Sequence, residues 1–173
     1  YIMGLTPLMS AVDSGHVEVA RLLLDRGATV DSPPSILEGT PLHAAVIHGF
    51  GHVVDLLVGA GANMNAYDRD GHTPLFAAMG KSEMVELLLR LGANPDAKFR
   101  DGGTVLHYAA GMGHIKEAKL LMHSGADVNA RDSGRATPLH FAAMVGNAAM
   151  VRLLLECGAE PTAKDEGGLT PSD

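Results

Sequence analysis

Nine histidines are the residues of this chain most able to do chemistry, because imidazole is a frequent metal ligand and proton carrier. A catalytic zinc site of the protease type would need a His-Glu-x-x-His segment, and a structural zinc site would need paired cysteines. The sequence has neither, and it contains a single cysteine, Cys157. We therefore expect no metal ion and no other cofactor.

One short segment is similar to the end of a phosphate-binding loop. Met79-Gly80-Lys81-Ser82 has the Gly-Lys-Ser order, but such a loop needs a glycine five residues before Gly80, where Leu75 stands. The loop should also follow a strand, whereas the preceding residues predict a helix. We interpret the segment as a turn between two helices, and we expect no small-molecule substrate.

No pairing of a nucleophile with a base stands out, so we expect no enzyme activity. Cys157 follows Leu153-Leu154-Leu155, which predicts a buried or half-buried thiol in a reducing compartment. The apolar runs are too short to span a bilayer, and the N-terminus shows no signal peptide. These features predict an intracellular, cytoplasmic protein that does not insert into membranes, with a nuclear location left open.

The charge balance argues against nucleic acid as the ligand. The chain has 20 acidic against 13 basic residues, a net charge of −7, whereas binding to a phosphate backbone depends on clustered lysine and arginine. We therefore expect no nucleic-acid partner.

The elements that must position any functional residue follow a repeat, the phrase Thr-Pro-Leu and its close variants. The phrase begins at Thr6, Thr40, Thr73, Thr104, Thr137 and Thr170, with steps of 34, 33, 31, 33 and 33 residues. A period of this size indicates a solenoid, in which each unit packs on its neighbours around one continuous core.

Residues 39–70 illustrate one unit. Thr40 is a good N-cap, and Pro41 suits the first position of a helix, where its missing N–H costs nothing. Gly49 ends this first helix, and a second apolar helix follows it up to Gly61, which can adopt the left-handed conformation of a C-cap. The turn-rich residues 63–71 then predict a hairpin that leads to the next threonine.

These motifs resemble the ankyrin repeat. The resemblance rests on the segments Thr40-Pro41-Leu42-His43-Ala44-Ala45, Gly61-Ala62-Asn63-Met64-Asn65-Ala66, Gly125-Ala126-Asp127-Val128-Asn129-Ala130 and Thr137-Pro138-Leu139-His140-Phe141-Ala142-Ala143, and on Asp70-Gly71. It implies an all-α solenoid of stacked helix-turn-helix repeats, from which β-hairpin or turn fingers project.

The resemblance covers nearly the whole chain as one domain, residues 1–173. The expected repeats are 4–38, 39–70, 71–101, 102–134 and 135–167, with the start of a sixth at 168–173. A solenoid needs polar caps and neither end shows one, so we expect a fragment of a longer protein. The resemblance also implies that the motif histidines His43, His107 and His140 bond to backbone rather than to a ligand.

Several units depart from this pattern. The first hairpin, residues 31–38, carries two prolines and predicts an irregular loop whose Ile36 and Leu37 either tuck onto the stack or face a partner. The third unit is two residues short between Ala78 and Val85. Phe76 replaces its motif histidine, as Met9 does in the first unit, and the fourth unit has Val105 in place of proline.

Two surfaces are candidates for binding under the geometry that the resemblance implies. The first is a groove formed by residues just before each turn between helices. The groove candidates are Ile47, His48, Met79, Lys81, Met112, Met144 and Val145. From the second unit onward this row is apolar, so it either receives a hydrophobic peptide or packs under the neighbouring hairpins.

The second surface consists of the fingertips. The fingertip candidates are Tyr67, Arg69, Asp70, His72, Phe99, Arg100, Asp101, Arg131, Ser133 and Arg135. Aromatic residues and arginine are enriched at binding hot spots, so Phe99 beside Arg100 is the preferred anchor.

The resemblance implies that the partner is a protein or peptide. The leading functional hypothesis is therefore a protein–protein interaction scaffold that binds through the groove and the fingertips. One alternative is a substrate-recruiting or regulatory domain of a larger enzyme or signalling protein. Another follows from the family alone: hairpin asparagines in some members are hydroxylated by an oxygenase, and Asn65 and Asn129 match that position.

Overall fold

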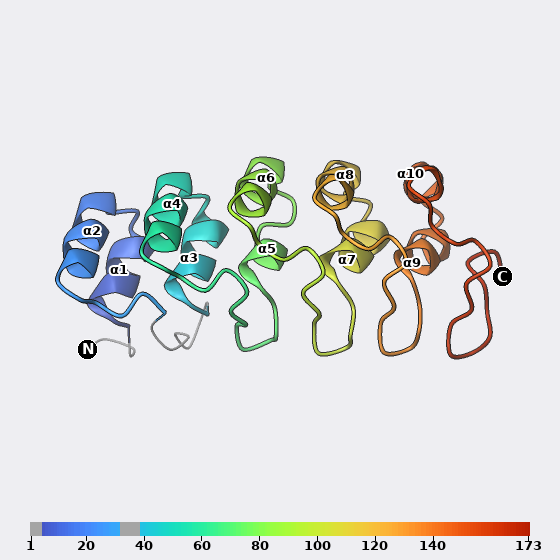
Figure 1. Cartoon of the computed structure of the whole chain (residues 1–173), viewed down its shortest axis with the longest axis horizontal. Helices are drawn as coiled ribbons and strands as arrows, with labels where there is room; N and C mark the ends of the chain where they lie inside the picture. Colours follow the sequence, from blue (N-terminus) through green and yellow to red (C-terminus); the bar gives the residue numbers. More distant parts are fainter. Residues whose placement is uncertain (1–4, 32–38) are drawn as a thin grey trace. The chain divides into compact units, whose positions relative to one another are not determined.

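The computed structural model describes residues 5–31 and 39–173, and these residues form ten helices in pairs (Figure 1). The pairs are α1 (Pro7–Asp13) with α2 (Val17–Asp25), α3 (Pro41–His48) with α4 (Gly51–Gly59), α5 (Pro74–Ala77) with α6 (Ser82–Arg90), α7 (Val105–Met112) with α8 (Ile115–His123), and α9 (Pro138–Met144) with α10 (Ala148–Glu156). The expected all-α class of paired helices is confirmed, and no strand forms in the two described ranges.

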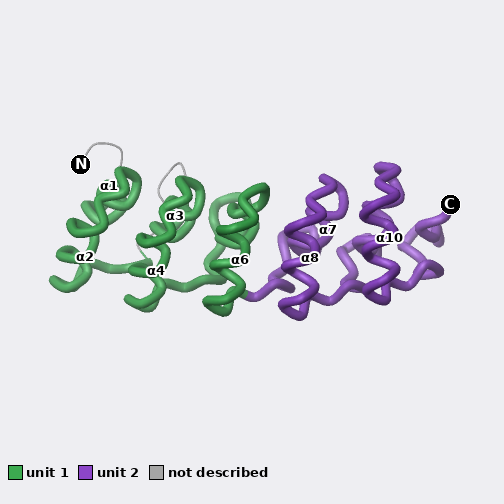
Figure 2. Tube along the Cα trace, turned by 90° about the horizontal axis from the view of Figure 1, so that it is seen from above, with its two compact units in different colours: residues 1–93 green, residues 94–173 purple. Residues whose placement is uncertain are grey.

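The chain divides into two compact units (Figure 2). The first covers residues 1–93 and holds α1 to α6, and the second covers residues 94–173 and holds α7 to α10. Within the first unit α1 packs on α3 and α3 on α5, and within the second α7 packs on α9. The core of each unit is built from small and aliphatic side chains, as expected for a chain with few aromatic residues.

Threonine begins each first helix. Thr6 Oγ1 accepts a hydrogen bond from the Met9 amide at 3.2 Å, and Thr73 Oγ1 accepts one from the Phe76 amide at 3.4 Å. Each bond satisfies an amide that has no partner inside the helix. Proline follows both threonines at the first helical position, as the sequence predicts.

The three motif histidines make a capping box with the threonine three residues before them. The Nδ1 atoms of His43, His107 and His140 accept from the backbone amide of that threonine at 3.2, 3.0 and 3.1 Å. The Nε2 atoms of the same three rings donate to the carbonyls of His72, Ala136 and Leu169 at 3.1, 3.1 and 3.2 Å. Each ring therefore starts its own helix and ties it to the next hairpin in the same unit.

This bonding requires a neutral ring with its proton on Nε2, because Nδ1 faces a backbone donor. Burial lowers the pKa of His43 and of His107, since a charged imidazolium is costly away from water. Hydrogen bonds to the carbonyls of His72 and Ala136 oppose that effect without overcoming it.

The third repeat is short where the sequence places its deletion. Its second helix begins at Ser82, eight residues after Pro74, whereas Gly51 begins α4 ten residues after Pro41. The loss falls at the junction of the helices, so α5 has four residues and α3 has eight. The expectations for Ile36 and Leu37 fall outside the described residues.

The prediction of a buried or half-buried Cys157 is wrong, because its thiol is exposed. Within the leucine run before it, Leu154 is fully buried and Leu155 is exposed. Cys157 is the C-cap of α10 and points away from the core like Leu155. A run of adjacent apolar residues does not mark one face of a helix, and helical periodicity assigns the inward position to Leu154.

None of the helices in the described part of the chain is long and apolar enough to cross a membrane.

Lowering the pH should destabilise the fold through His43 and His107. The pKa of each ring is depressed on folding, so the stabilisation is present above the unfolded pKa of about 6.5 and is lost as pH falls from there toward the folded pKa. Urea unfolding at about pH 7.5 and about pH 5.5 should show a lower midpoint at the lower pH.

The variant His107→Phe, which carries the side chain that the third repeat has at this position, should be less stable at the higher pH but should lose less on acidification. The variant His52→Gln, which removes an exposed ring outside the capping boxes, is the control for the loss of a histidine. Equal pH dependence in the wild type and His107→Phe would contradict this assignment.

Candidate binding surfaces

Three apolar side chains at the ends of α7 and α9 form an exposed patch in the second unit. Met112 ends α7 and is 61% exposed, Met144 ends α9 and is 77% exposed, and Val145 follows as the C-cap of α9. We call these three residues the methionine patch. The hairpins of the second unit leave its side chains uncovered, although α7 and α9 themselves pack together.

A hollow of about 660 Å³ lies beside the patch. Phe141 and Met144 line it from α9, and Leu169 and Pro171 line it from the C-terminal segment. Leu169 is itself exposed. Sequence reasoning missed Leu169, although its position directly before the last threonine, where glycine or alanine stands in the two preceding repeats, is a usable signal.

The predicted groove residues of the first unit make more contacts within the protein than those of the second unit do. Ile47 is exposed near the end of α3, whereas Met79 is half-buried. The Lys81 ammonium donates to the carbonyl of Val46 at 3.4 Å and also to that of Ile47. A cation at this end of α3 is favourable because the last carbonyls of a helix carry partial negative charge. Lys81 therefore caps the C-terminal end of α3.

His48 lies against Asp13 and Phe50. Its Nε2 atom is 3.8 Å from Asp13 Oδ1, and its ring stacks on Phe50 with centroids 5.5 Å apart. Asp13 Oδ1 is buried without a hydrogen-bond partner, although a third of the side chain remains in contact with solvent.

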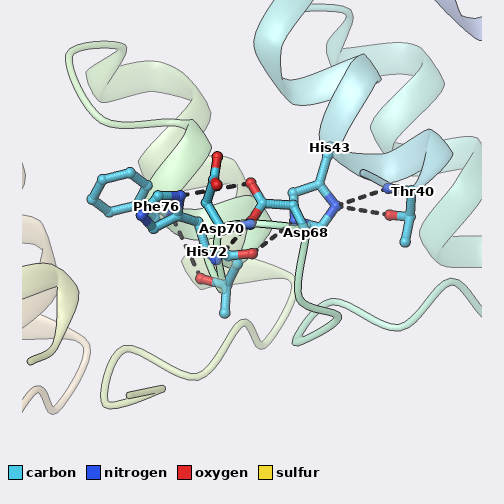
Figure 3. A network of polar contacts seen from close by, with 7 residues as sticks. Thr40, His43, Asp68, Asp70, His72 and Phe76 are labelled. Atoms are coloured by element: carbon cyan, nitrogen blue, oxygen red, sulfur yellow. Dashed lines mark hydrogen bonds and ion pairs between the residues drawn. The ribbon is translucent and has the colours of Figure 1, made fainter. Parts of the chain in front are cut away.

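The finger of residues 68–72 is a closed hydrogen-bond network (Figure 3). Asp68 Oδ1 accepts from the amides of Asp70 and His72 at 2.9 and 2.8 Å, and Asp68 Oδ2 is 3.6 Å from His72 Nδ1. The His72 ring stacks on Phe76 with centroids 4.2 Å apart. Because the His72 carbonyl also accepts from His43, the finger is joined to α3.

The side chains of Asp68, Asp70 and His72 also come close enough to approach one cation, a grouping that sequence reasoning missed. The same turn closes other fingers without histidine, since Asp132 Oδ1 accepts from the Ala136 amide at 2.8 Å and Asp165 Oδ1 from the Leu169 amide at 2.9 Å. We interpret the carboxylate of Asp68 as a group that closes the turn. The absence of a metal site stays a prediction.

Backbone bonds join the fingers of the second unit at their tips. The Ser133 amide donates to the Asp101 carbonyl at 2.8 Å, and the Glu166 amide donates to the Gly134 carbonyl at 2.8 Å. At Gly102 only glycine fits, because a Cβ atom there would lie 2.8 Å from the Ser133 nitrogen. The fingertips of this unit therefore form one continuous edge.

The predicted fingertip residues differ in how much they offer to a partner. Phe99, the preferred anchor, is half-buried, whereas Tyr67 is the more exposed aromatic residue. Arg69, Arg100, Asp101 and Ser133 are exposed, and Arg131 is half-buried with its Nη1 atom 3.5 Å from the Lys164 carbonyl.

Arg135 has a strained backbone. Its φ is 62°, the only positive value at a non-glycine residue in the described ranges. The corresponding finger positions hold Gly71, Gly102 and Gly168, with φ values of 86°, 76° and 81°. A side chain in the left-handed region is disfavoured, and such strain is often retained where the side chain has a use. Arg135 is therefore a stronger candidate than its neighbours.

The two asparagines matching the modification position differ in their surroundings. Asn129 Nδ2 donates to the Gly158 carbonyl at 3.1 Å, and Asn129 Oδ1 accepts from the Glu160 amide at 2.8 Å. This side chain thus links consecutive repeats of the second unit. Asn65 is exposed, and its backbone amide donates to Asn63 Oδ1 at 3.0 Å. Hydroxylation at either residue stays a prediction.

Comparison with known protein families matches almost the whole chain. The family model "Ankyrin repeats (3 copies)" matches residues 32–99 and 80–165, and the model "Ankyrin repeat" matches residues 3–33.

Known relatives match over shorter stretches. The chain is 43% identical over 72 residues to Ankyrin repeat domain-containing protein 17 of Homo sapiens, which is 41% of the chain and 3% of that protein. It is 42% identical over 72 residues to Ankyrin repeat and KH domain-containing protein 1 of Homo sapiens, again 41% of the chain and 3% of the relative. It is 38% identical over 77 residues to Alpha-latrotoxin-Lhe1a of Latrodectus hesperus, 44% of the chain and 5% of the toxin.

Replacing Arg135 by glycine should stabilise the protein. The substitution relieves the left-handed strain, offset in part by the greater freedom of glycine in the unfolded chain, for a net gain of about 0.5–1 kcal/mol. Urea unfolding measures this change in the free energy of unfolding. Arg131→Gly is the control, because Arg131 has no left-handed strain to relieve and its replacement should not raise the stability. Equal or lower stability of Arg135→Gly would show that its side-chain contacts outweigh the strain.

Proposed function

We propose that this chain, which belongs to the ankyrin repeat family, is a non-catalytic module that binds a partner protein by holding an apolar segment of it against the methionine patch. The observation that carries the proposal is the exposure of Met112 and Met144 at the ends of two neighbouring helices. Large apolar side chains gathered in one place on a surface mark sites of interaction.

The chemistry of the patch suits a peptide side chain. Methionine is flexible and polarisable, so it adapts its shape to an aliphatic or aromatic group. The hollow beside Met144 offers about 660 Å³ for such a group, and Phe141 and Leu169 supply further apolar contact. Burying these side chains against a partner removes apolar surface from water and so favours binding.

The fingers add polar selectivity. Arg131 and Arg135 occur on the continuous edge of the second unit, and a guanidinium group pairs with a carboxylate through two parallel hydrogen bonds. Asp132 and Asp165 have oxygens committed to closing their own turns, so their carboxylates are partly satisfied. A partner segment with an acidic residue beside its apolar residues fits this arrangement.

The first unit has a smaller surface that also combines exposed apolar and charged side chains. Ile47 and Tyr67 are its exposed apolar groups, and Arg69 and Asp70 are exposed on the finger. His48 contributes a ring that can present a donor to a partner or to Asp13.

A second candidate is the same binding role exercised within a longer protein, as a recruiting or regulatory domain. The chain spans only 3–5% of the length of the relatives described above, which favours this reading. In that case the partner segment is a substrate or a regulator of another domain, and the residues that bind it are unchanged.

Selection from a random-peptide phage display library against the 173-residue chain tests the proposal. Enriched peptides should share large apolar residues, with acidic residues beside them. A synthetic peptide of the enriched sequence should bind the wild-type chain and should bind the double variant Met112→Lys/Met144→Lys at least about tenfold more weakly, because a buried ammonium group without a partner is costly.

The control is Ala149→Lys, which places a lysine at an exposed position of α10 outside the methionine patch. It should bind the peptide as the wild type does, and circular dichroism should show all three proteins equally helical. Undiminished binding by the double variant would reject the methionine patch, and failure to enrich any peptide would reject peptide binding itself.

A further inference from the structure

The methionines of this chain differ widely in how much of their side chains water can reach. Three of them are nearly inaccessible, with exposed fractions of 2%, 6% and 0% for Met9, Met84 and Met150. Three more are half-buried, namely Met64, Met79 and Met122. Within residues 5–31 and 39–173, the exposed methionines are Met112 and Met144, both of which belong to the methionine patch.

The position in the repeat decides this exposure, not the residue type. Met84 and Met150 are the third residues of α6 and α10, where α4 carries the buried Val53. This position faces the core in each of these three helices. Met112 is the last residue of α7 and stays exposed although α9 packs on α7. Its thioether is therefore accessible to a small solute while the protein is folded.

Hydrogen peroxide is a small solute that reacts with an accessible thioether. A lone pair of the sulfur attacks one peroxide oxygen, and an S–O bond forms as the O–O bond breaks. The sulfur loses two electrons and the peroxide gains them. The departing hydroxide takes the proton of the transferred hydroxyl group and leaves as water, and the product is methionine sulfoxide.

We propose that Met112, together with Met144, is a site of oxidation by peroxide, and that the oxidised patch no longer holds its partner. This inference rests on the proposed function, in which the patch buries an apolar segment. A sulfoxide oxygen is a hydrogen-bond acceptor, and burying it without a donor is costly. Val145 in the patch and Phe141 beside Met144 have apolar side chains, so neither supplies a donor.

Oxidation at this surface should leave the fold intact, because the stack does not require methionine at either position. Met112 lies eight residues after its capping threonine, and His48 and Val145 occupy the same place in two other repeats. Met144 lies seven residues after its capping threonine, where Ile47 stands in the second repeat. Peroxide reaches the buried methionines of the core only when the protein opens. The effect is thus confined to the binding surface.

Partner binding and oxidation should oppose each other. A segment held against the patch covers Met112 and keeps peroxide from its sulfur, whereas a sulfoxide at Met112 weakens the binding of that segment. The patch therefore responds to peroxide in the free protein and is shielded in the complex. Reductases that use a dithiol reverse the reaction, since the dithiol becomes a disulfide and the sulfoxide oxygen leaves as water.

Peptide mapping by mass spectrometry tests whether the site exists, and it does not require a partner. The chain should carry Cys157→Ser, because the exposed thiol of Cys157 also reacts with peroxide. During treatment with hydrogen peroxide, Met112 and Met144 should convert to sulfoxide at least about tenfold faster than Met9 and Met150. Similar rates at the exposed and the buried methionines would overturn the proposal.

Binding of the phage-selected peptide tests the consequence. Both the Cys157→Ser chain and its Met112→Leu/Met144→Leu derivative should bind the peptide before treatment, because leucine keeps the patch apolar at similar volume. After treatment and removal of the peroxide, the methionine form should bind at least about fivefold more weakly, and the leucine form should be unchanged. Methionine sulfoxide reductases for both epimers, with dithiothreitol, should restore binding. Circular dichroism should stay the same throughout.

The outcomes separate this inference from the proposed function. Unchanged binding by the methionine form once Met112 is fully oxidised would overturn the inference and leave the proposed function standing. An equal loss of binding by the leucine form would also overturn it, since a group other than the two methionines would then be responsible. If the untreated chain bound no selected peptide, the proposed function would fail and this inference with it, whatever the pattern of oxidation.

Discussion

The structure depends on one interaction, the histidine that caps its own helix and bonds to the next hairpin. In the first unit, His43 receives the Thr40 amide on one nitrogen and donates to the His72 carbonyl with the other. A single buried ring thus starts a helix and fixes the finger of the following repeat. Burial keeps this ring neutral by lowering its pKa, and neutrality is what both bonds require. Local structure and repeat stacking are therefore coupled through one protonation state.

Because of this coupling, the beginning and the end of the first helix of a repeat have different roles. Its beginning is committed to threonine, proline and histidine, which serve the stack. The end of the helix makes no capping or stacking bond of this kind, and the residue type there varies between repeats, with Ile47, Met112 and Met144 as examples. In the first unit the deletion brings Lys81 to the end of α3, where its ammonium satisfies free carbonyls. In the second unit the helix ends keep their methionines exposed.

The sequence predicted the features that local chemistry determines. Threonine followed by proline marked the helix starts, and the short step marked the shortened junction before Ser82. The backbone bonds of the motif histidines were implied by the resemblance to the ankyrin repeat and are present in the structure. It failed for Cys157, where a run of leucines was taken as a sign of burial although the helix turns that position outward. Contacts between distant residues, such as Lys81 with Ile47, and the strain at Arg135 depend on three-dimensional neighbours that no local pattern specifies.

The exposed apolar residues are of two kinds, and the repeat itself tells them apart. Val19 and Leu155 are exposed in the first and last helix pairs of this sequence, whereas Val53 and Met122, at the same positions of inner repeats, are covered. A neighbouring repeat is enough to bury them. Met112 belongs to a first helix that already has a neighbour, α9, packed against it, and it remains exposed. Stacking does not cover the position of Met112, so contact with something other than a repeat is needed to remove this side chain from water, which is why the methionine patch is assigned to a partner protein.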